Sequence, residues 1–223
     1  MTSATAIELL KSRRSIRDFT NEPVSEEQIS TILEAGRWAP SWLNIQPWKF
    51  IVIDDPGIRA EICTAVPTTE KAGVNDAPVC IAVCVEDYSR SAHLAEDGAA
   101  ATLNMSLAAH SLGLGTFWIG MFDRGNRRKS PEAKIRKLLR IPDDFRLISL
   151  LPIGVPAKSP KSARKKPEEI VCKNYFSTEI GRGTSAEQTL RQKIENKGAA
   201  SFAPVPSRAP WIEAIITKIG TGN

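Results

Sequence analysis

The stretches PVCIAVCV (Pro78–Val85) and LAEDGAAATLNMSLAAHSL (Leu94–Leu112) decide the fold of this chain. The first is a short continuous apolar run, and its residues from Val79 to Val85 predict a buried strand. The second is rich in alanine and is followed by Gly113, a residue type favoured just past a helix, so it predicts a long helix. The small side chains of this helix indicate close packing at the centre of the fold.

Capping residues and prolines mark the elements on either side of these two. Ser25 and Gln28 form a capping-box pattern at the start of a helix that ends about Gly36 or Arg37. Apolar spacing and turn residues predict helices over Thr5–Lys11, over Ile58–Ala65, after Ser130-Pro131 and near residues 186–195. They predict strands over Lys49–Ile53 and Phe145–Val155, and one short strand entering a turn over Gly115–Gly120. Because helices and strands mix without a regular βαβ repeat, we expect an α+β sheet covered by helices rather than a doubly wound domain.

Length and composition fit one compact domain and disfavour several classes of protein. The 223 residues are 42% apolar, and the net charge of +5 falls short of the charge typical of a nucleic-acid-binding protein. The four cysteines show no CxxC spacing and no short Cys/His cluster surrounds the two histidines, so we expect no metal site. Cys80 and Cys84 share one face of the predicted strand, where we expect buried free thiols. With no signal region and no apolar stretch of membrane-spanning length, the sequence predicts a soluble cytoplasmic protein.

Two basic clusters have side chains that suit a phosphate group. Arg13-Arg14-Ser15-Ile16-Arg17 places three guanidinium groups and a hydroxyl within five residues, and arginine binds phosphate oxygens through charge-assisted hydrogen bonds. The second cluster follows the last predicted strand and contains Lys158, Lys161, Arg164, Lys165 and Lys166. Local chemistry leaves alternatives open, because the first cluster also fits a solvated basic turn and the second also fits a flexible loop or, less well, a nucleic-acid contact.

Two other segments suit a flat ring with polar edges. The loop Pro40–Trp48 carries a hydroxyl, two carboxamides and two indoles, and carboxamides pair with a ring edge while indoles cover its faces. In Trp118-Ile119-Gly120, the glycine lets the backbone approach such a ring. The alternatives are an aromatic anchor to the core for the loop and an ordinary strand end for the glycine segment. Satisfied polar contacts, rather than acid–base roles, are expected for three residues of the long helix, Asp97, Asn104 and His110.

Taken in chain order, these segments resemble the FMN-dependent nitroreductase family from about Ser12 to Phe176. The resemblance is carried by RRSIRDF, PSWLNIQPWKF, LGLGTFWIG and PIGVP followed by the basic segment. It implies a nitroreductase-like α+β fold with a mixed, largely antiparallel central sheet flanked by helices. It also implies a homodimer with two FMN molecules at the subunit interface. The expected domains are an FMN-binding domain over residues 1–176 and a C-terminal extension over residues 177–223, for which packing on the partner subunit is one option.

The same resemblance assigns FMN contacts to individual residues of this chain. The phosphate and the ribityl chain would be held by Arg13, Arg14, Ser15 and Arg17. The partner subunit's FMN would be reached by Pro40, Ser41, Trp42, Asn44 and Gln46. The reactive nitrogen N5 would lie beside Ile119 and Gly120, and a C-terminal phosphate contact would come from Arg164 and Lys165. Trp42 stands where many family members have a small, serine-like residue. This difference concerns the substrate pocket more than the cofactor.

The function implied is an NAD(P)H-dependent FMN oxidoreductase. NADH or NADPH would supply electrons by a ping-pong mechanism to a small acceptor such as a nitroaromatic, a quinone or an enone. Catalysis would need no side-chain acid, because FMN carries the chemistry. The alternatives are a flavin-consuming or dehalogenating branch of the family and a non-catalytic flavin-binding protein. A nucleic-acid-binding domain is disfavoured by the 25 interspersed acids and the absence of a recognition motif, and no membrane partner is expected.

Overall fold

The structure is a computed structural model that describes residues 6–87, 93–123, 125, 128–172 and 174. The chain divides into two units, residues 1–162 and 163–223, and the sheet and the six α-helices of the described residues belong to the first. Of the second unit, the described part contains a short 3-10 helix, Pro167–Glu169. The helix expected near residues 186–195 and the domain boundary expected at residue 176 lie outside the described residues, so both stay predictions.

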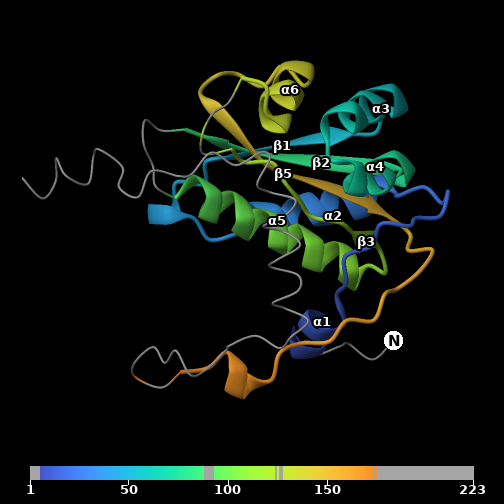
Figure 1. The fold of residues 1–223 in the computed structure, drawn as a ribbon, viewed down its shortest axis with the longest axis vertical. Helices are drawn as coiled ribbons and strands as arrows, with labels where there is room; N and C mark the ends of the chain where they lie inside the picture. Colours follow the sequence, from blue (N-terminus) through green and yellow to red (C-terminus); the bar gives the residue numbers. More distant parts are fainter. Residues whose placement is uncertain (1–5, 88–92, 124, 126–127, 173, 175–223) are drawn as a thin grey trace, which may run out of the picture. The chain divides into compact units, whose positions relative to one another are not determined.

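An antiparallel sheet forms the centre of the first unit (Figure 1). Its strands are β1 (Trp48–Ile53), β2 (Val79–Glu86), β3 (Gly115–Thr116), β4 (Ile119–Gly120) and β5 (Phe145–Gly154). The order is β1-β2-β5-β3, and β4 also pairs with β5. Among the described residues, all four strand pairings are antiparallel, while a parallel contact between Ser15 and Thr116 is an isolated bridge. The predicted α+β class, with a largely antiparallel sheet, is confirmed.

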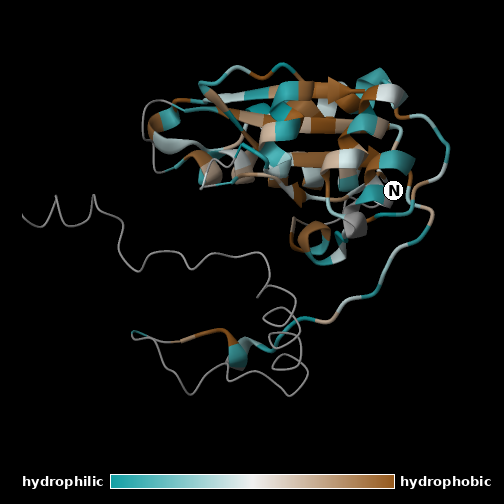
Figure 2. Cartoon of the chain, turned by 45° about the horizontal axis from the view of Figure 1, so that its top comes forward, coloured by the Kyte–Doolittle hydropathy of each residue, from teal (hydrophilic) through white to brown (hydrophobic). Residues whose placement is uncertain are grey.

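Helices cover both faces of the sheet, which explains why β2 reads as a continuous apolar run. On one face Cys80, Ala82 and Cys84 pack in a core with α3 (Pro56–Ala65), α4 (Thr68–Asp76) and α6 (Pro131–Leu138). On the other face Ile81 and Val83 pack with α2 (Glu26–Arg37) and α5 (Leu94–Ser111). Figure 2 shows the strands as largely apolar between the helices. The two thiols are therefore buried on one face, as expected.

Close packing of α5 depends on its small residues, as the alanine-rich sequence indicates. A Cβ atom at Gly98 would come within 2.6 Å of Ile148, so only glycine fits where this helix crosses β5. On the neighbouring helix α2, a Cβ at Gly36 would come within 2.8 Å of Met105. Because Gly36 and Gly98 have no side chain, α2 can lie close to α5, and α5 can lie close to the sheet.

Most helix boundaries agree with the sequence, and the exceptions have local causes. The Ser25/Gln28 capping box is present, and α1 (Ala6–Ser12) lies within one residue of its predicted bounds. Helix α3 begins at Pro56 rather than Ile58, because the Asp55 side chain caps it by accepting from the Ile58 N–H. Helix α4 has no sequence prediction, since it lacks an apolar stripe at helical spacing.

The segment Gly115–Gly120 forms two short strands, β3 and β4, and the prediction of one strand is wrong. Thr116 pairs with Ile153 and Ile119 with Leu150, so Phe117 faces Pro152 between them. The Phe117 N–H donates to the Pro152 carbonyl (3.2 Å), but proline has no N–H to return the bond. The ladder is interrupted at that point.

Candidate functional site

The first basic cluster is attached to the sheet through its own backbone. Helix α1 ends at Ser12, and the Ile16 N–H then donates to the Thr116 carbonyl (2.9 Å) at the start of β3. The Ile16 side chain is buried, and the Thr116 hydroxyl lies 2.6 Å from that of Ser106 on α5. These contacts fix the segment beside β3, with Arg13 and Arg14 at its beginning.

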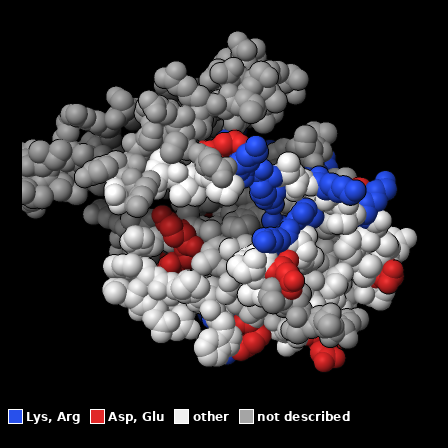
Figure 3. All heavy atoms as spheres, turned by 90° about the horizontal axis from the view of Figure 1, so that it is seen from below, with Lys and Arg blue, Asp and Glu red and all other residues white. Residues whose placement is uncertain are grey.

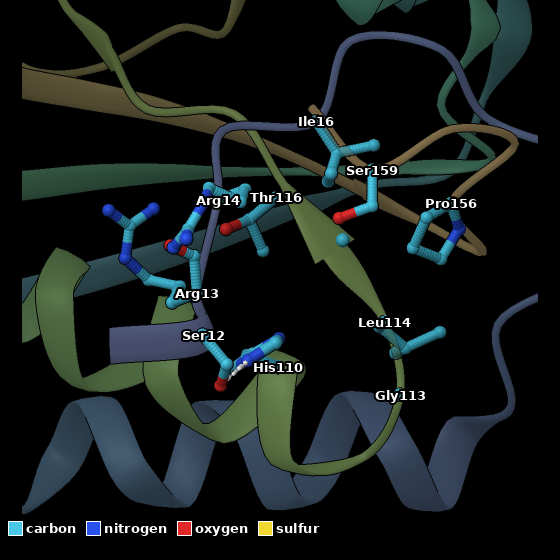
Figure 4. Close-up of a pocket in the computed structure, with 11 residues that line it drawn as sticks. Ser12, Arg13, Arg14, Ile16, His110, Gly113, Leu114, Thr116, Pro156 and Ser159 are labelled. Atoms are coloured by element: carbon cyan, nitrogen blue, oxygen red, sulfur yellow. Dashed lines mark hydrogen bonds between the residues drawn. The ribbon is translucent and has the colours of Figure 1, made fainter. Parts of the chain in front are cut away.

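A pocket of about 140 Å³ opens where the end of α1, the end of α5 and the residues after β5 meet. Figure 4 shows Ser12, Arg13, Arg14 and His110 on one side of this pocket. Across it lie Leu114, Pro156 and Ser159, and the lining is completed by Ile16, Gly113, Gly115 and Thr116. The sequence predicted Arg13 and Arg14 as phosphate-binding residues, and the structure brings both to this pocket.

The pocket is positively charged and, among the described residues, no carboxylate lines it. Arg14 donates from Nη1 to the carbonyls of Lys11 (2.6 Å) and Arg13 (2.8 Å), which holds its guanidinium at the end of α1. Burial lowers the pKa of His110, and the positive charges of Arg13 and Arg14 lower this pKa further. In Figure 3, which views the molecule from the side of α1, Lys and Arg side chains gather on the face that is seen. This charge suits an anion.

Ser15 and Arg17 belong to the same sequence cluster but lie outside the lining of this pocket. Ser15 forms the isolated bridge with Thr116. The guanidinium of Arg17 lies over the ring of Phe117, 3.8 Å from its centroid, a cation–π contact. The cluster is therefore divided, with Arg13 and Arg14 at the pocket and Arg17 against Phe117.

The loop from Pro40 to Pro47 is held by hydrogen bonds to its backbone. Asp97 on α5 accepts from the Trp42 N–H (3.0 Å), and the Ser41 hydroxyl accepts from the Gln46 N–H (2.9 Å). Leu43, Asn44 and Gln46 have positive φ angles of 48°, 56° and 54°. Three such residues within four positions are unusual without glycine, and backbone strain of this kind gathers at functional sites.

Three large apolar side chains of this loop are exposed. Trp42 is 47% exposed, Leu43 76% and Ile45 40%, and the adjacent Trp38 is 72% exposed. The Trp42 ring stacks on His93 with 5.5 Å between centroids. The Gln46 carboxamide donates to the side-chain oxygen of Asn44 (3.3 Å). Clustered exposed apolar groups of this size indicate an interaction surface rather than a solvated loop.

Ile119 and Gly120 form β4, and the two residues face in opposite directions. Ile119 is fully buried, whereas Gly120 is exposed and a Cβ atom placed on it would meet no heavy atom within 4 Å. Its glycine is thus not demanded by packing within the described chain. An open backbone of this kind leaves room for a flat group to approach, as the sequence interpretation requires.

A buried ion pair fixes the segment that follows β4. The carboxylate of Glu132 on α6 accepts from Nε and Nη2 of Arg146 on β5, both at 2.6 Å, and from the Asp123 N–H at 2.8 Å. Arg146 also donates to the Asp123 carbonyl (2.6 Å). The N–H and the carbonyl of Asp123, three residues after Gly120, are therefore both hydrogen-bonded to this ion pair. Sequence reasoning missed this pair, because 14 positions separate its members.

Several other site residues were missed or lie elsewhere. Arg164 and Lys165 belong to the second unit, in which both are exposed, and their phosphate contact stays a prediction. The pocket residues Ser12, His110, Thr116 and Ser159 were not assigned to a site. Ser12 and His110 had a usable signal, since each stands at the end of a predicted helix next to a motif segment. Asp97 and Asn104 make satisfied polar contacts, as expected, with Asn104 donating to the Ala35 carbonyl (3.1 Å).

Comparisons with known proteins bear on the family and the fold of this chain. The model of the Nitroreductase family matches residues 10–66 and 64–155. A protein of Methanothermobacter thermautotrophicus, named as an NADH dehydrogenase/NAD(P)H nitroreductase, is 37% identical over 158 residues, which are 69% of this chain and 78% of the relative. The FMN reductase [NAD(P)H] of Bacillus subtilis is 33% identical over 190 residues, covering 74% of this chain and 71% of the relative.

A solved structure extends the likeness to three dimensions. The FMN-dependent nitroreductase of Clostridium difficile R20291 superposes with a TM-score of 0.69 at 29% identity, covering 76% of this chain and 99% of that one. The family match spans the loop, β4 and the pocket lining except Pro156 and Ser159. The chain therefore belongs to the nitroreductase family.

Proposed function

We propose that this protein is an FMN-dependent oxidoreductase that transfers electrons from NADH or NADPH to a small acceptor, such as a nitroaromatic, a quinone or an enone, by a ping-pong mechanism. The observation that carries the proposal is the pocket at Arg13 and Arg14, which no carboxylate of the described residues lines, in a chain of the nitroreductase family. Relatives named NAD(P)H nitroreductase and FMN reductase support the cofactor and the electron donor.

The residues of the pocket fit the phosphate end of FMN. Two guanidinium groups, three hydroxyls and an imidazole supply donors, and a phosphate monoester offers acceptor oxygens with up to two negative charges. A volume of about 140 Å³ suits this end only, since complete small-molecule sites measure roughly 300–1,000 Å³. We propose that Ser15 and Arg17 hold the adjoining part of the cofactor, and that Arg164 and Lys165 add a phosphate contact.

The flavin ring would lie at surfaces that the described chain leaves open. We propose that the backbone of Ile119 and Gly120 lies beside N5, where nothing meets a Cβ built on the glycine. When bound, FMN supplies the hydride and electron chemistry, so the protein requires no side-chain acid. The side chains named here bind the cofactor, orient it and limit access to one face.

A second subunit would complete the site. The loop carrying Pro40, Ser41, Trp42, Asn44 and Gln46 presents exposed apolar side chains at its tip. We propose that this loop packs on a partner subunit and reaches its FMN, so that the protein is a homodimer. Sedimentation of the FMN-loaded protein tests this assembly, and a monomer that binds FMN tightly would contradict it.

The test of the function is the visible spectrum of the purified protein, followed without air by NADH or NADPH. A yellow protein that either nucleotide bleaches, and that an acceptor recolours, has the proposed activity. A yellow protein that neither nucleotide bleaches is a flavin-binding protein without this activity. A colourless protein that FMN cannot reconstitute would overturn the proposal.

A further inference from the structure

His110 lines the same pocket as Arg13 and Arg14, and the positive charge of the two arginines does not explain why an imidazole lies beside them. It stands in the last turn of α5, and its Nε2 lies 2.7 Å from the hydroxyl of Ser12 at the end of α1. The two residues are 98 positions apart, and Figure 4 shows them meeting at the edge of the pocket below Arg13 and Arg14. Two permanent cations and one ionisable base thus share one small cavity.

Among the described residues that line the pocket with His110, the charged side chains are positive. The charged groups that lower its pKa are Arg13 and Arg14, from the segment after α1. On the remaining sides, the pocket is lined by Gly113, Leu114, Pro156 and Ser159, which are uncharged. Placing a protonated imidazole beside two guanidinium groups is unfavourable unless an anion joins them.

We propose that His110 is a further residue of the phosphate site and that it binds the FMN phosphate as an imidazolium. This inference rests on the proposed function, since it concerns the anion that this function places in the pocket. The proton comes from solvent, and no bond other than the N–H of the ring is formed. The phosphate supplies the negative charge that the free pocket lacks.

Ser12 can stay hydrogen-bonded to His110 when the imidazole gains a proton. An imidazolium donates from both ring nitrogens, so Nε2–H donates to the Ser12 hydroxyl oxygen. The Ser12 hydroxyl then donates to the Leu9 carbonyl, which lies 3.3 Å away. In the neutral pocket, Ser12 can instead donate to Nε2. The serine therefore pairs with the ring in either state. Nδ1–H is a donor in both states, and protonation adds the Nε2–H and the positive charge.

The proposal fixes the sign of the coupling between protons and FMN. In the free pocket the pKa of His110 lies below its ordinary value, and a bound dianion raises this pKa. Between the two values, FMN binding takes up one proton, so His110 strengthens binding as the pH falls through this window. The phosphate itself loses a charge near pH 6, which opposes the effect on affinity. For that reason the His110 pKa is the cleaner quantity to measure.

The experiment is an NMR pH titration of the imidazole signals with and without FMN. The chain has two histidines, and His110→Gln assigns the signals while keeping a neutral partner for Ser12. We expect FMN to raise the pKa of His110 by about one unit or more, which is a tenfold coupling. Riboflavin, which lacks the phosphate, should leave this pKa unchanged. In fluorescence titrations near pH 6, His110→Gln should bind FMN several-fold more weakly than the wild type, with the difference vanishing near pH 8.

The outcomes separate this inference from the proposed function. If FMN binds and the pKa of His110 stays the same or falls, the inference is wrong while the function stands. An equal rise with riboflavin would also overturn it, because the phosphate would not be the cause. If FMN does not bind at all, the proposed function fails, and inorganic sulfate replaces it as the probe. A sulfate-induced rise then supports an anion site at His110, and no rise refutes it.

Discussion

The Glu132–Arg146 pair allows a quantitative test of how the segment after β4 is held. The side chains are 2% and 9% exposed, and the carboxylate accepts both guanidinium bonds and the Asp123 N–H. Glu132→Ala leaves the Arg146 charge buried without its partner and the Asp123 N–H without its acceptor. Breaking a buried pair in this way costs about 3–5 kcal/mol, against a total stability of about 5–15 kcal/mol for a domain.

Urea unfolding of the FMN-free protein measures this cost without a contribution from ligand binding. With a slope of about 1–3 kcal/mol per molar urea, the midpoint of Glu132→Ala should fall by at least about 1 M. The double variant Glu132→Leu/Arg146→Met should recover most of the loss, because apolar side chains of similar volume can replace a buried ion pair.

The matched control is the Glu34–Arg37 pair on α2, which has the same N···O distance of 2.6 Å. Its side chains are 53% and 56% exposed, so water already solvates both charges and Glu34→Ala should leave the urea midpoint unchanged. If Glu132→Ala shifted the midpoint no more than Glu34→Ala, burial would not be the source of the stabilisation. The Glu132–Arg146 pair and its bonds to Asp123 would then stabilise the fold no more than an exposed ion pair does.

Three other predictions concern the pocket, the loop and the core. Arg13→Ala should weaken FMN binding by about tenfold to a hundredfold, as expected for a lost charged hydrogen bond. The control Lys11→Ala lies outside the pocket lining and should leave FMN binding unchanged. If the two variants bound FMN equally tightly in a fluorescence titration, the phosphate assignment would be contradicted. Trp42→Ser keeps the backbone bond to Asp97, so it should retain FMN and its melting temperature. It should react faster with bulky quinones relative to small nitroaromatics. A lower melting temperature with an unchanged preference between these acceptors would instead show that the indole has a packing role. Burial raises the pKa of Cys80 and Cys84 to about 12, so iodoacetamide should modify neither thiol in the folded protein near pH 8, and native-state labelling as fast as in urea would refute their burial.

Local features of the sequence determined the main elements and the family. The buried strand β2, the long helix α5 and the capping box at Ser25 follow from patterns that extend over one strand or one helical turn. The order of the motif segments identified the fold, because each carries an unusual side-chain set at a defined place along the chain. Burial of Cys80 and Cys84 followed from the apolar run that contains them.

The tertiary structure decided how these pieces meet. Strand β3 is separated from β4 because Phe117 faces Pro152, a partner that the segment's own sequence does not reveal. Arg13 and Arg17 belong to one basic cluster of the sequence, and only the structure shows that they lie in different places. Arg13 lines the pocket, whereas Arg17 lies over the ring of Phe117. His110 reaches Ser12 across 98 positions. Helix propensity, caps and hydrophobic periodicity act over a few residues, whereas strand pairing and side-chain contacts depend on how distant elements pack together.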